Sequence, residues 1–238
     1  MPKISHKKYL ELQKKYYLGK ILCTIDPEHP DAFLHHQFNR VFIIFGFTGS
    51  GKDTIINEFL KKNLLKPKKT RYSFVKFIRT LTRQRRPVEL DIADGFFIEK
   101  ELFDHLKKNG RFFYSYKRYS GKEFGYDTIH FIFELIRKNI IMVGGGEKNF
   151  EGLITGIKSL FDSIPITTIF INRPKAEIIK SLKKRGGNQE GMKKRIEHIE
   201  NAWYKNPKKP MDYCIWNRDL KKAVEQLIKI VNDELQIL

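Results

Sequence analysis

The sequence predicts an α/β fold, in which helices flank both faces of a mostly parallel sheet. Short apolar runs alternate with segments of helical spacing over residues 41–145 and again from 166 to the end of the chain, which is typical of strand–helix–strand units. The first apolar run, at 41–45, passes directly into a glycine-rich turn and then into a helical pattern. Because parallel strands need long crossover connections, helices between the strands fit this order.

Each predicted element follows from a local pattern. Strands are expected where a run is apolar or alternates, and helices where apolar residues recur at intervals of three and four. The expected strands are 41–45, 72–78, 112–119, 139–143, 166–171 and 212–216. The expected helices are 53–62, 101–108, 128–137, 150–161, 175–184, 190–205 and 220–235.

Turn-forming residues support several of these boundaries. Asn109-Gly110 ends the helix at 101–108, because glycine readily takes the conformation that closes a helix. Pro165 precedes the strand at 166–171, a position where proline removes no hydrogen bond from the sheet.

Composition divides the chain into an extension and a main domain. Residues 1–40 are basic and contain an irregular connector with prolines, so we predict an N-terminal extension ahead of a domain at 41–238. Residues 72–126 are richer in aromatics and loops, which predicts a small inserted subdomain. The extension is interpreted either as a packed helix or as a docking element for nucleic acid, a membrane or a partner.

The formal net charge is +19, from 46 Lys and Arg against 27 Asp and Glu. Nucleic acid, an anionic membrane and a small polyanionic substrate all fit such a charge, as does a solvated basic surface. The basic residues are scattered and form no tandem motif. We therefore expect weak, salt-dependent binding of nucleic acid, without specific recognition.

Two further features indicate a cytoplasmic protein that does not enter a membrane. No apolar run approaches the roughly 18 residues of a membrane-spanning helix, and no apolar segment follows the first lysines. Cys23 and Cys214 lie far apart and form no metal-binding pattern, which fits a reducing compartment. We expect a cytoplasmic monomer or homodimer.

The glycine-rich turn at 46–54 has the order of a phosphate-binding loop, with a strand before it and a helix after it. Its glycines allow backbone N–H groups to surround phosphate oxygens, and the helix adds the positive end of its dipole. Lys52 is expected to reach the β- and γ-phosphates of ATP as a point charge. The residues assigned to the nucleotide are Gly46, Thr48, Gly49, Ser50, Gly51, Lys52, Asp53 and Thr54.

One position departs from the usual loop. The residue after the lysine is normally Ser or Thr, whose hydroxyl meets Mg²⁺, but here it is Asp53, and the hydroxyl follows at Thr54. Two interpretations of Asp53 stay open. Either it binds Mg²⁺ together with Thr54, directly or through water, or it caps the helix N-terminus and stabilises its dipole.

An ordered set of segments beyond the loop resembles the guanylate kinase family, over roughly residues 41–236. The segments are Thr82-Arg83-Gln84-Arg85-Arg86 with Glu89, Asp94-Gly95-Phe96-Phe97, Gly121-Lys122-Glu123-Phe124-Gly125, Arg173-Pro174, Leu182-Lys183-Lys184-Arg185-Gly186 with Arg195, and Asp212-Tyr213-Cys214-Ile215-Trp216-Asn217. The resemblance implies a kinase that uses ATP and Mg²⁺, with a core, an acceptor-binding subdomain at 72–126 and a helical lid at 183–200.

The resemblance also places an acceptor site in the inserted subdomain. Arg83 and Arg86 match the arginines that hold the acceptor's phosphate, and Ser115, Phe124 and Gly125 match neighbouring positions of that site. Guanidinium groups suit this role, because they pair bidentately with phosphate oxygens.

The expected catalytic set is likewise implied by the resemblance. Arg185 and Arg195 match lid arginines that approach the transferring phosphates, and they join Lys52 and Asp53. Asn217 follows the family's last strand and is assigned to ATP. Such a cluster suits phosphoryl transfer, which depends mainly on positioning and charge neutralisation.

Several positions depart from the guanylate kinase pattern. Where the family reads guanine with a glutamate, the matching position here is near Ser115 or Tyr114, and neither is a carboxylate. Gly95 and Phe124 stand in place of tyrosines that contact the acceptor phosphate. The expected Asp-x-Asp pair is replaced by Val143 and Gly145. Each missing charged partner weakens recognition by about 1.5–3 kcal/mol, so these residues fit GMP poorly.

Ribose 1,5-bisphosphate phosphokinase, a relative of that family, resembles the chain in more detail. It carries Asp directly after Gly-Lys, as in Lys52-Asp53-Thr54, and it lacks the acidic pair. This resemblance implies transfer of the γ-phosphoryl group of ATP to a small phosphorylated acceptor, ribose 1,5-bisphosphate in preference to GMP. The alternatives are a guanylate or other nucleoside monophosphate kinase, or a catalytically weak guanylate kinase-like interaction module.

Overall fold

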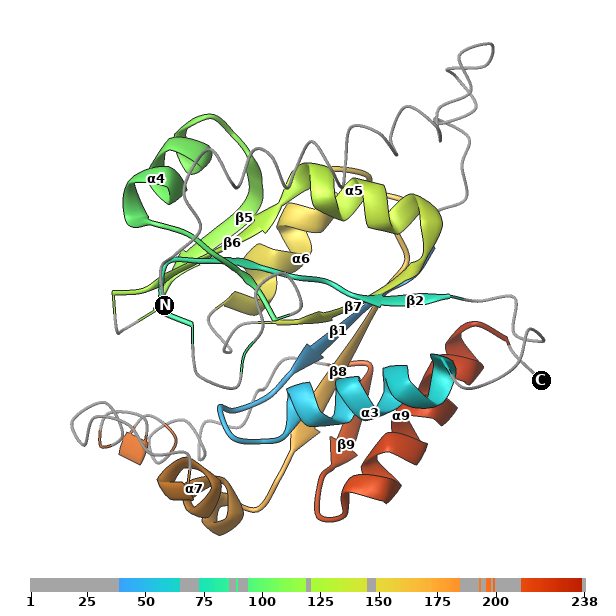
Figure 1. The fold of residues 1–238 in the computed structure, drawn as a ribbon. Helices are drawn as coiled ribbons and strands as arrows, with labels where there is room; N and C mark the ends of the chain where they lie inside the picture. Colours follow the sequence, from blue (N-terminus) through green and yellow to red (C-terminus); the bar gives the residue numbers. More distant parts are fainter. Residues whose placement is uncertain are drawn as a thin grey trace. The chain divides into compact units, whose positions relative to one another are not determined.

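The computed structural model describes residues 39–64, 73–85, 89, 94–118, 121–144, 149–184, 193, 196–197, 199 and 211–236. Figure 1 shows the fold, and the elements with assigned bounds are β1 (Val41–Phe45), α3 (Lys52–Leu64), β2 (Phe74–Lys76), β3 (Thr80–Leu81), β4 (Phe96–Phe97), α4 (Lys100–Lys108), β5 (Phe112–Lys117), β6 (Glu123–Asp127), α5 (Thr128–Arg137), β7 (Asn139–Val143), α6 (Phe150–Lys158), β8 (Ile166–Asn172), α7 (Lys175–Lys184), β9 (Tyr213–Trp216) and α9 (Leu220–Glu234). They fall into two compact units. The first contains residues 41–76, 141–151 and 166–238, and the second contains 77–140 and 152–165.

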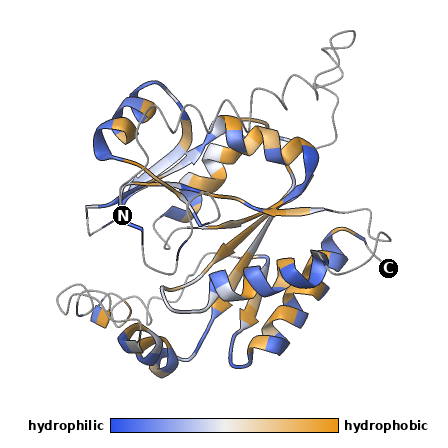
Figure 2. Ribbon diagram, in the orientation of Figure 1, coloured by the Kyte–Doolittle hydropathy of each residue, from blue (hydrophilic) through white to orange (hydrophobic). Residues whose placement is uncertain are grey.

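The first unit is built on a five-stranded sheet in the order β2-β7-β1-β8-β9. β1 pairs with β8 in parallel, from Val41↔Ile166 to Phe45↔Phe170, and β8 pairs with β9 in parallel. Every residue of β1 and β7 is buried, as expected of inner strands in a parallel sheet that helices cover. Figure 2 shows β1 as apolar along its whole length.

Helices α3 and α9 pack on the same side of this sheet (Figure 1) and share one core with it. α9 begins after Asp219, whose carboxylate accepts a hydrogen bond from the Lys222 backbone N–H at 2.8 Å. This cap satisfies an otherwise free N–H and stabilises the helix by about 1 kcal/mol. The shared core consists of Phe42, Ile44, Ile55, Ile56, Phe59, Ile141, Val143, Ile169, Ile171, Ile215, Ala223, Val224, Leu227, Ile230 and Val231.

The second unit contains a four-stranded sheet in the order β4-β3-β6-β5. β6 pairs antiparallel with β5 and β3, whereas β3 pairs parallel with β4. Phe103 of α4 packs against Phe112 of β5, with ring centroids 4.8 Å apart. Phe77 stacks on Tyr126 of β6 at 6.0 Å. Aromatic contacts of this kind hold the unit together, consistent with the aromatic-rich insert that the sequence predicts.

The structure confirms the predicted α/β fold class with its parallel central sheet. Most predicted elements are present, with ends shifted by a few residues, as local patterns allow. The short strands β3, β4 and β6 were not predicted. The sequence assigns 80–94 to a polar connection and 121–125 to a motif, because segments this short carry no measurable period.

One element lies in a different place from the one predicted. β2 was predicted within the insert at 72–126, but the structure places it in the five-stranded sheet, beside β7. The insert's boundaries otherwise stay a prediction. The extension at 1–40, except residues 39 and 40, and most of the predicted helix at 190–205 lie outside the described residues.

The second unit buries a titratable side chain, His130 of α5, which is only 4% exposed. Its ring stacks on Phe77 at 4.7 Å and meets Phe96 edge-on at 5.9 Å. Burial lowers the pKa of His130 to about 4, although the nearby Asp127 carboxylate opposes part of the shift. The imidazole is therefore neutral in the folded protein at neutral pH.

We predict that His130 makes the protein less stable in weak acid. The unfolded chain takes up a proton near the ordinary histidine pKa of about 6.5, whereas the folded protein does so only near 4. Stability therefore falls as pH drops from about 6.5 to about 4, by up to about 3 kcal/mol from this residue. Urea unfolding at pH 7, 6, 5 and 4.5 measures the loss, and His130→Gln should flatten that dependence.

His105→Gln is the matched control, because His105 lies exposed on α4. It should leave the pH dependence of unfolding as in the parent. Equal pH dependence in His130→Gln and the parent would contradict the assignment.

Candidate active site

The glycine-rich loop connects the end of β1, at Phe45, to the start of α3. Gly46 and Gly51 have φ of 142° and 91°, in the region that glycine alone enters without strain. A Cβ atom on Gly46 would meet the Ile171 carbonyl oxygen, and one on Gly51 would meet the Asn217 side-chain amide. The backbone therefore lies directly against the ends of β8 and β9, at the carboxyl edge of the parallel sheet.

The ammonium group of Lys52 lies over this loop. Its Nζ donates to the carbonyl oxygens of Gly46 at 2.8 Å and Phe47 at 2.7 Å, and lies 3.5 Å from Ser50 Oγ. Ser50 itself is fully buried. The lysine is thus held at the loop by three acceptors, and a bound polyphosphate would compete with the two carbonyls for its three donors.

Asp53 lies in the first turn of α3 rather than ahead of it. The interpretation of Asp53 as the N-cap of this helix is therefore wrong, because α3 begins at Lys52 and a capping residue precedes the first helical residue. Its charge still lies at the positive end of the helix dipole. Asp53 Oδ1 also forms an ion pair with Nζ of Lys76, the last residue of β2, at 3.2 Å.

The donors at this end of α3 suit Mg²⁺, the metal that the resemblance implies. The Asp53 side chain is 62% exposed, and Thr54 beside it is exposed. Mg²⁺ prefers oxygen ligands and is usually held by one or two carboxylates together with substrate phosphates. In the part of the chain that the structure describes, no group of three or more His, Cys, Asp or Glu could hold a metal. Asp53 and Thr54 would hold the metal together with the phosphates of the nucleotide.

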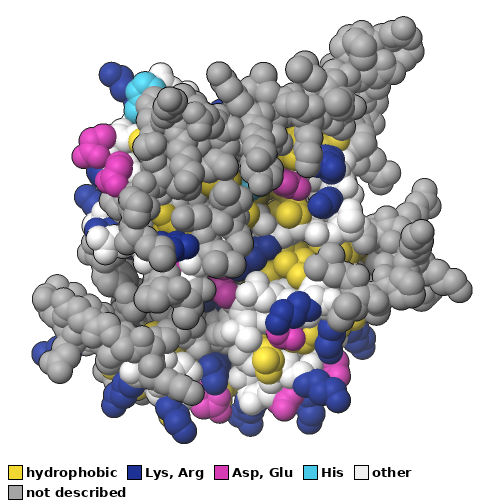
Figure 3. All heavy atoms as spheres, viewed as in Figure 1, with side chains coloured by type: hydrophobic (Ala, Val, Ile, Leu, Met, Phe, Trp, Pro, Cys, Tyr) yellow, Lys and Arg dark blue, Asp and Glu magenta, His cyan; other side chains and the backbone are white. Residues whose placement is uncertain are grey.

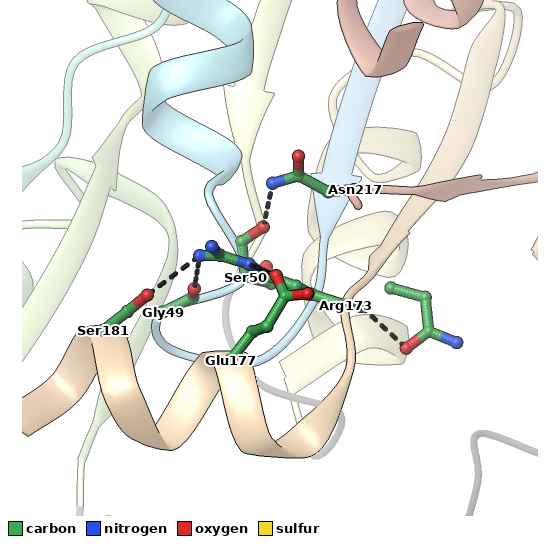
Figure 4. A network of polar contacts seen from close by, with 7 residues as sticks. Gly49, Ser50, Arg173, Glu177, Ser181 and Asn217 are labelled. Atoms are coloured by element: carbon green, nitrogen blue, oxygen red, sulfur yellow. Dashed lines mark hydrogen bonds and ion pairs between the residues drawn. The ribbon is translucent and has the colours of Figure 1, made fainter. Parts of the chain in front are cut away.

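Two side chains hold the loop from outside (Figure 4). Arg173 Nη1 donates to the Gly49 carbonyl oxygen at 3.2 Å, and Asn217 Nδ2 donates to the Ser50 carbonyl oxygen at 2.7 Å. Asn217 was predicted to contact ATP. The structure places its amide on the loop, in a buried position.

The predicted acceptor residues belong to the second unit. Arg83 forms a bidentate pair with Glu89, with Nη1–Oε2 2.6 Å and Nη2–Oε1 2.5 Å, and its guanidinium lies 5.0 Å from the centre of the Phe97 ring. Both partners are largely buried. An acceptor phosphate must exchange with the Glu89 carboxylate to pair with Arg83 in the same way.

The other predicted acceptor residues lie on β5 and β6, where Ser115 and Gly125 pair across the strands. Phe124 is 3% exposed. Two further guanidinium groups lie over its ring, Arg79 at 5.4 Å and Arg118 at 4.5 Å from the centroid. No role was predicted for Arg79 or Arg118. Their only signal was the number of arginines near this motif.

Three predicted site residues, Arg86, Arg185 and Arg195, lie outside the described residues, as does most of the lid at 183–200. Their roles stay predictions. Lys76 was not predicted, and Arg173 was named only within a family-like segment, without a role. Arg173 had a usable signal, because it directly follows a strand of the parallel sheet, and ligands bind at the carboxyl ends of such strands.

The described surface is basic but mixed in charge. On the face drawn in Figure 3, Lys and Arg side chains lie scattered, with Asp and Glu side chains between them. Among the helices of the described residues, none is both long and apolar enough to cross a membrane.

Comparison with known proteins finds relatives along most of the chain. A family model described as Guanylate kinase matches residues 38–234. Guanylate kinase from Mycoplasmoides gallisepticum is 28% identical over 193 residues, covering 80% of this chain and 91% of that protein. Guanylate kinase from Mycoplasma genitalium is 30% identical over 225 residues, covering 90% and 81%. Guanylate kinase from Thermotoga maritima is 29% identical over 201 residues, covering 82% and 87%.

A solved structure agrees with these sequence matches. The crystal structure of guanylate kinase from Anaplasma phagocytophilum has a TM-score of 0.56 and 19% sequence identity, and the match covers 83% of this chain and 86% of that chain. At this identity the likeness shows the shared fold.

Lys52→Ala should remove turnover while leaving the fold intact. Loss of a preorganised charge at the transferring phosphates lowers kcat/KM by about 100-fold or more. Coupled ADP release measures turnover, calorimetry measures ATP binding, and thermal unfolding checks the fold. Lys61→Ala is the control, since Lys61 lies exposed on the same helix and pairs with Glu58 at 2.8 Å. A Lys52→Ala enzyme as active as the parent would refute the assignment.

Asp53→Asn tests the metal role of Asp53. If the carboxylate helps to hold Mg²⁺, the Mg²⁺ concentration for half-maximal turnover should rise several-fold, because the amide is a weaker ligand. Glu58→Gln, on the exposed face of the same helix, should leave that concentration unchanged. If the Mg²⁺ titration is unaltered in Asp53→Asn, Asp53 does not bind the metal and its role is the ion pair with Lys76.

Proposed function

The chain belongs to the guanylate kinase family, and from that premise we propose that it transfers the γ-phosphoryl group of ATP to a nucleoside monophosphate, with GMP as the first candidate. Family membership makes it an ATP-dependent kinase, a phosphotransferase that uses Mg²⁺. One observation carries the proposal. The family match over residues 38–234 contains the whole phosphate loop with its Gly51-Lys52 pair.

The proposed acceptor is GMP, in place of the ribose 1,5-bisphosphate that the sequence alone favoured. The relatives from Mycoplasmoides gallisepticum, Mycoplasma genitalium and Thermotoga maritima are each named guanylate kinase, and the matches span most of their lengths. Nothing in the comparisons supports the ribose acceptor. Its main sequence support was Asp53 after the lysine, and the ion pair with Lys76 accounts for an acidic residue there without reference to the acceptor.

The proposal assigns the acceptor to Arg83, Arg86 and the strand pair that carries Ser115, Phe124 and Gly125. Ser115 and Gly125 are register partners across β5 and β6. A serine hydroxyl makes a weaker hydrogen bond to a base than a carboxylate does. We therefore infer a high KM for GMP and partial use of other monophosphates.

The same residues divide the chemistry between them. The loop amides and Lys52 bind the ATP phosphates, and Arg83 binds the acceptor phosphate after exchanging Glu89. Arg185 and Arg195 are assigned to the charge that develops on the transferring group. Mg²⁺, when bound, neutralises charge on the β- and γ-phosphates. Positioning and charge stabilisation of this kind supply most of the rate in phosphoryl transfer.

We also place the enzyme in the cytoplasm, as a monomer or homodimer that acts on small molecules. Cys214, in the described part of the chain, is an exposed free thiol, which suits a reducing compartment. A catalytically weak interaction module is disfavoured, because such a module has no need for a lysine held at a phosphate loop.

A side-by-side acceptor screen tests the proposal. ADP release is followed with GMP, dGMP, AMP, CMP, UMP and ribose 1,5-bisphosphate, each with ATP and Mg²⁺. GMP should give the highest kcat/KM, with a smaller margin over the other monophosphates than a site with charged base contacts provides. Lys52→Ala, purified in parallel, corrects for contaminating kinases. Turnover of ribose 1,5-bisphosphate without turnover of GMP would overturn the proposal and restore the ribose acceptor.

A further inference from the structure

Arg173 connects the phosphate loop to α7 through one guanidinium group (Figure 4). It directly follows β8 and precedes α7. Its Nη1 donates to the Gly49 carbonyl oxygen at 3.2 Å and to Ser181 Oγ at 2.9 Å, while Nε donates to Glu177 Oε2 at 3.0 Å. A single side chain thus holds the loop on one side and two residues of α7 on the other.

The contact with Gly49 fixes a specific peptide plane of the loop. The peptide bond is planar and trans, so its C=O and N–H groups point in opposite directions. Arg173 holds the Gly49 carbonyl, and the Ser50 N–H of the same peptide donates to the Phe47 carbonyl oxygen at 3.1 Å. Both polar groups of this peptide are therefore occupied, and the turn from Phe47 to Ser50 is held closed.

Asn217 has the same effect on the next peptide. Its Nδ2 holds the Ser50 carbonyl from outside at 2.7 Å. The Gly51 N–H belongs to the same peptide and points in the opposite direction from its C=O, so it is directed away from Asn217. Arg173 and Asn217 together determine how two successive peptides of the loop are oriented.

Apolar contacts join α7 to the same part of the loop. Ile178 and Leu182 of α7 form a small buried cluster with Ile199, and Phe47 of the loop packs against it. A Cβ atom built on Gly49 would lie 3.2 Å from Ile178 Cγ2. A shift of α7 would therefore move the loop through both its apolar contacts and the Arg173 contact.

The charge of Arg173 is committed to this connection. Glu177 lies in the first turn of α7 and forms an ion pair with Arg173 at 3.0 Å, and the Arg173 side chain is 26% exposed. A guanidinium group spans several acceptors in fixed directions, which lysine with its single nitrogen does not. This separates Arg173 from the arginines assigned to the transferring phosphates.

We propose that Arg173 is a positioning residue that couples the shape of the phosphate loop to α7, so that the affinity for a nucleoside triphosphate depends on where this helix lies. α7 leads directly into the predicted lid at 183–200. The inference rests on the ATP-dependent activity of the family and is independent of which acceptor is used.

The test measures ATP binding by calorimetry, and the KM values for ATP and the acceptor, in Arg173→Gln and Arg173→Lys. Both variants should weaken ATP binding and raise the KM for ATP by about tenfold, the effect of losing one charged hydrogen bond. The KM for the acceptor should stay within twofold of the parent. Arg137→Gln is the control, because Arg137 lies over the Phe133 ring in the second unit.

Ser181→Ala tests the connection without altering the loop or Arg173 itself. It should raise the ATP dissociation constant two- to threefold. Combined with Arg173→Gln it should add nothing, because residues that act through one contact are not additive.

Unchanged ATP affinity in Arg173→Gln would overturn the inference, as would full additivity with Ser181→Ala. Equal rises in both KM values with a lowered melting temperature would assign Arg173 to general stability instead. If Arg173→Gln fails to fold, Ser181→Ala still decides between these outcomes. A parent chain that binds ATP but does not phosphorylate GMP leaves this inference standing and removes only the proposed acceptor.

Discussion

The phosphate loop depends on the outward anchoring of its carbonyl groups. A loop binds phosphate when its N–H groups converge, and they converge only if the carbonyls of the same peptides are satisfied elsewhere. In this chain the Asn217 amide takes one such carbonyl, that of Ser50. Arg173 takes the Gly49 carbonyl and so holds closed the turn in which the Ser50 N–H donates to Phe47, and Lys52 donates to the carbonyls of Gly46 and Phe47. All of these contacts lie within the first unit.

Parallel pairing brings these groups together. β1, β8 and β9 are neighbours that run in the same direction, so the residues that follow them meet at one edge of the sheet. The loop follows β1, Arg173 follows β8 and Asn217 follows β9. The close approach of Gly46 to Ile171 and of Gly51 to Asn217 excludes side chains at both glycines. The conformation of the loop therefore depends on the register of the strands that it packs against.

Sequence patterns predicted the features that depend on local order. The apolar run at β1, the glycines after it and the helical spacing of α3 were sufficient for the fold class and for the loop. They did not predict contacts between residues that are distant in the sequence. Lys76 is 23 residues from Asp53, and no period or motif indicates that β2 brings the two side chains together. Asn217 was assigned to the nucleotide because its motif was recognised, whereas its hydrogen bond to Ser50 depends on strand order. Arg79 and Arg118, whose guanidinium groups lie over the Phe124 ring, were missed for the same reason, since their contacts arise from the pairing of strands that are too short to predict.

The pairing of Arg83 with Glu89 has a consequence for how an acceptor is selected. Because Arg83 already pairs with the Glu89 carboxylate, an incoming anion must displace that carboxylate. To do so, the incoming group must carry a higher charge density than the carboxylate. A phosphate dianion meets that condition, whereas a carboxylic acid or a neutral sugar does not. In the proposed acceptor site, Arg83 would thus select by charge, whereas the carboxylate that is missing near Ser115 would have selected the base by hydrogen bonding.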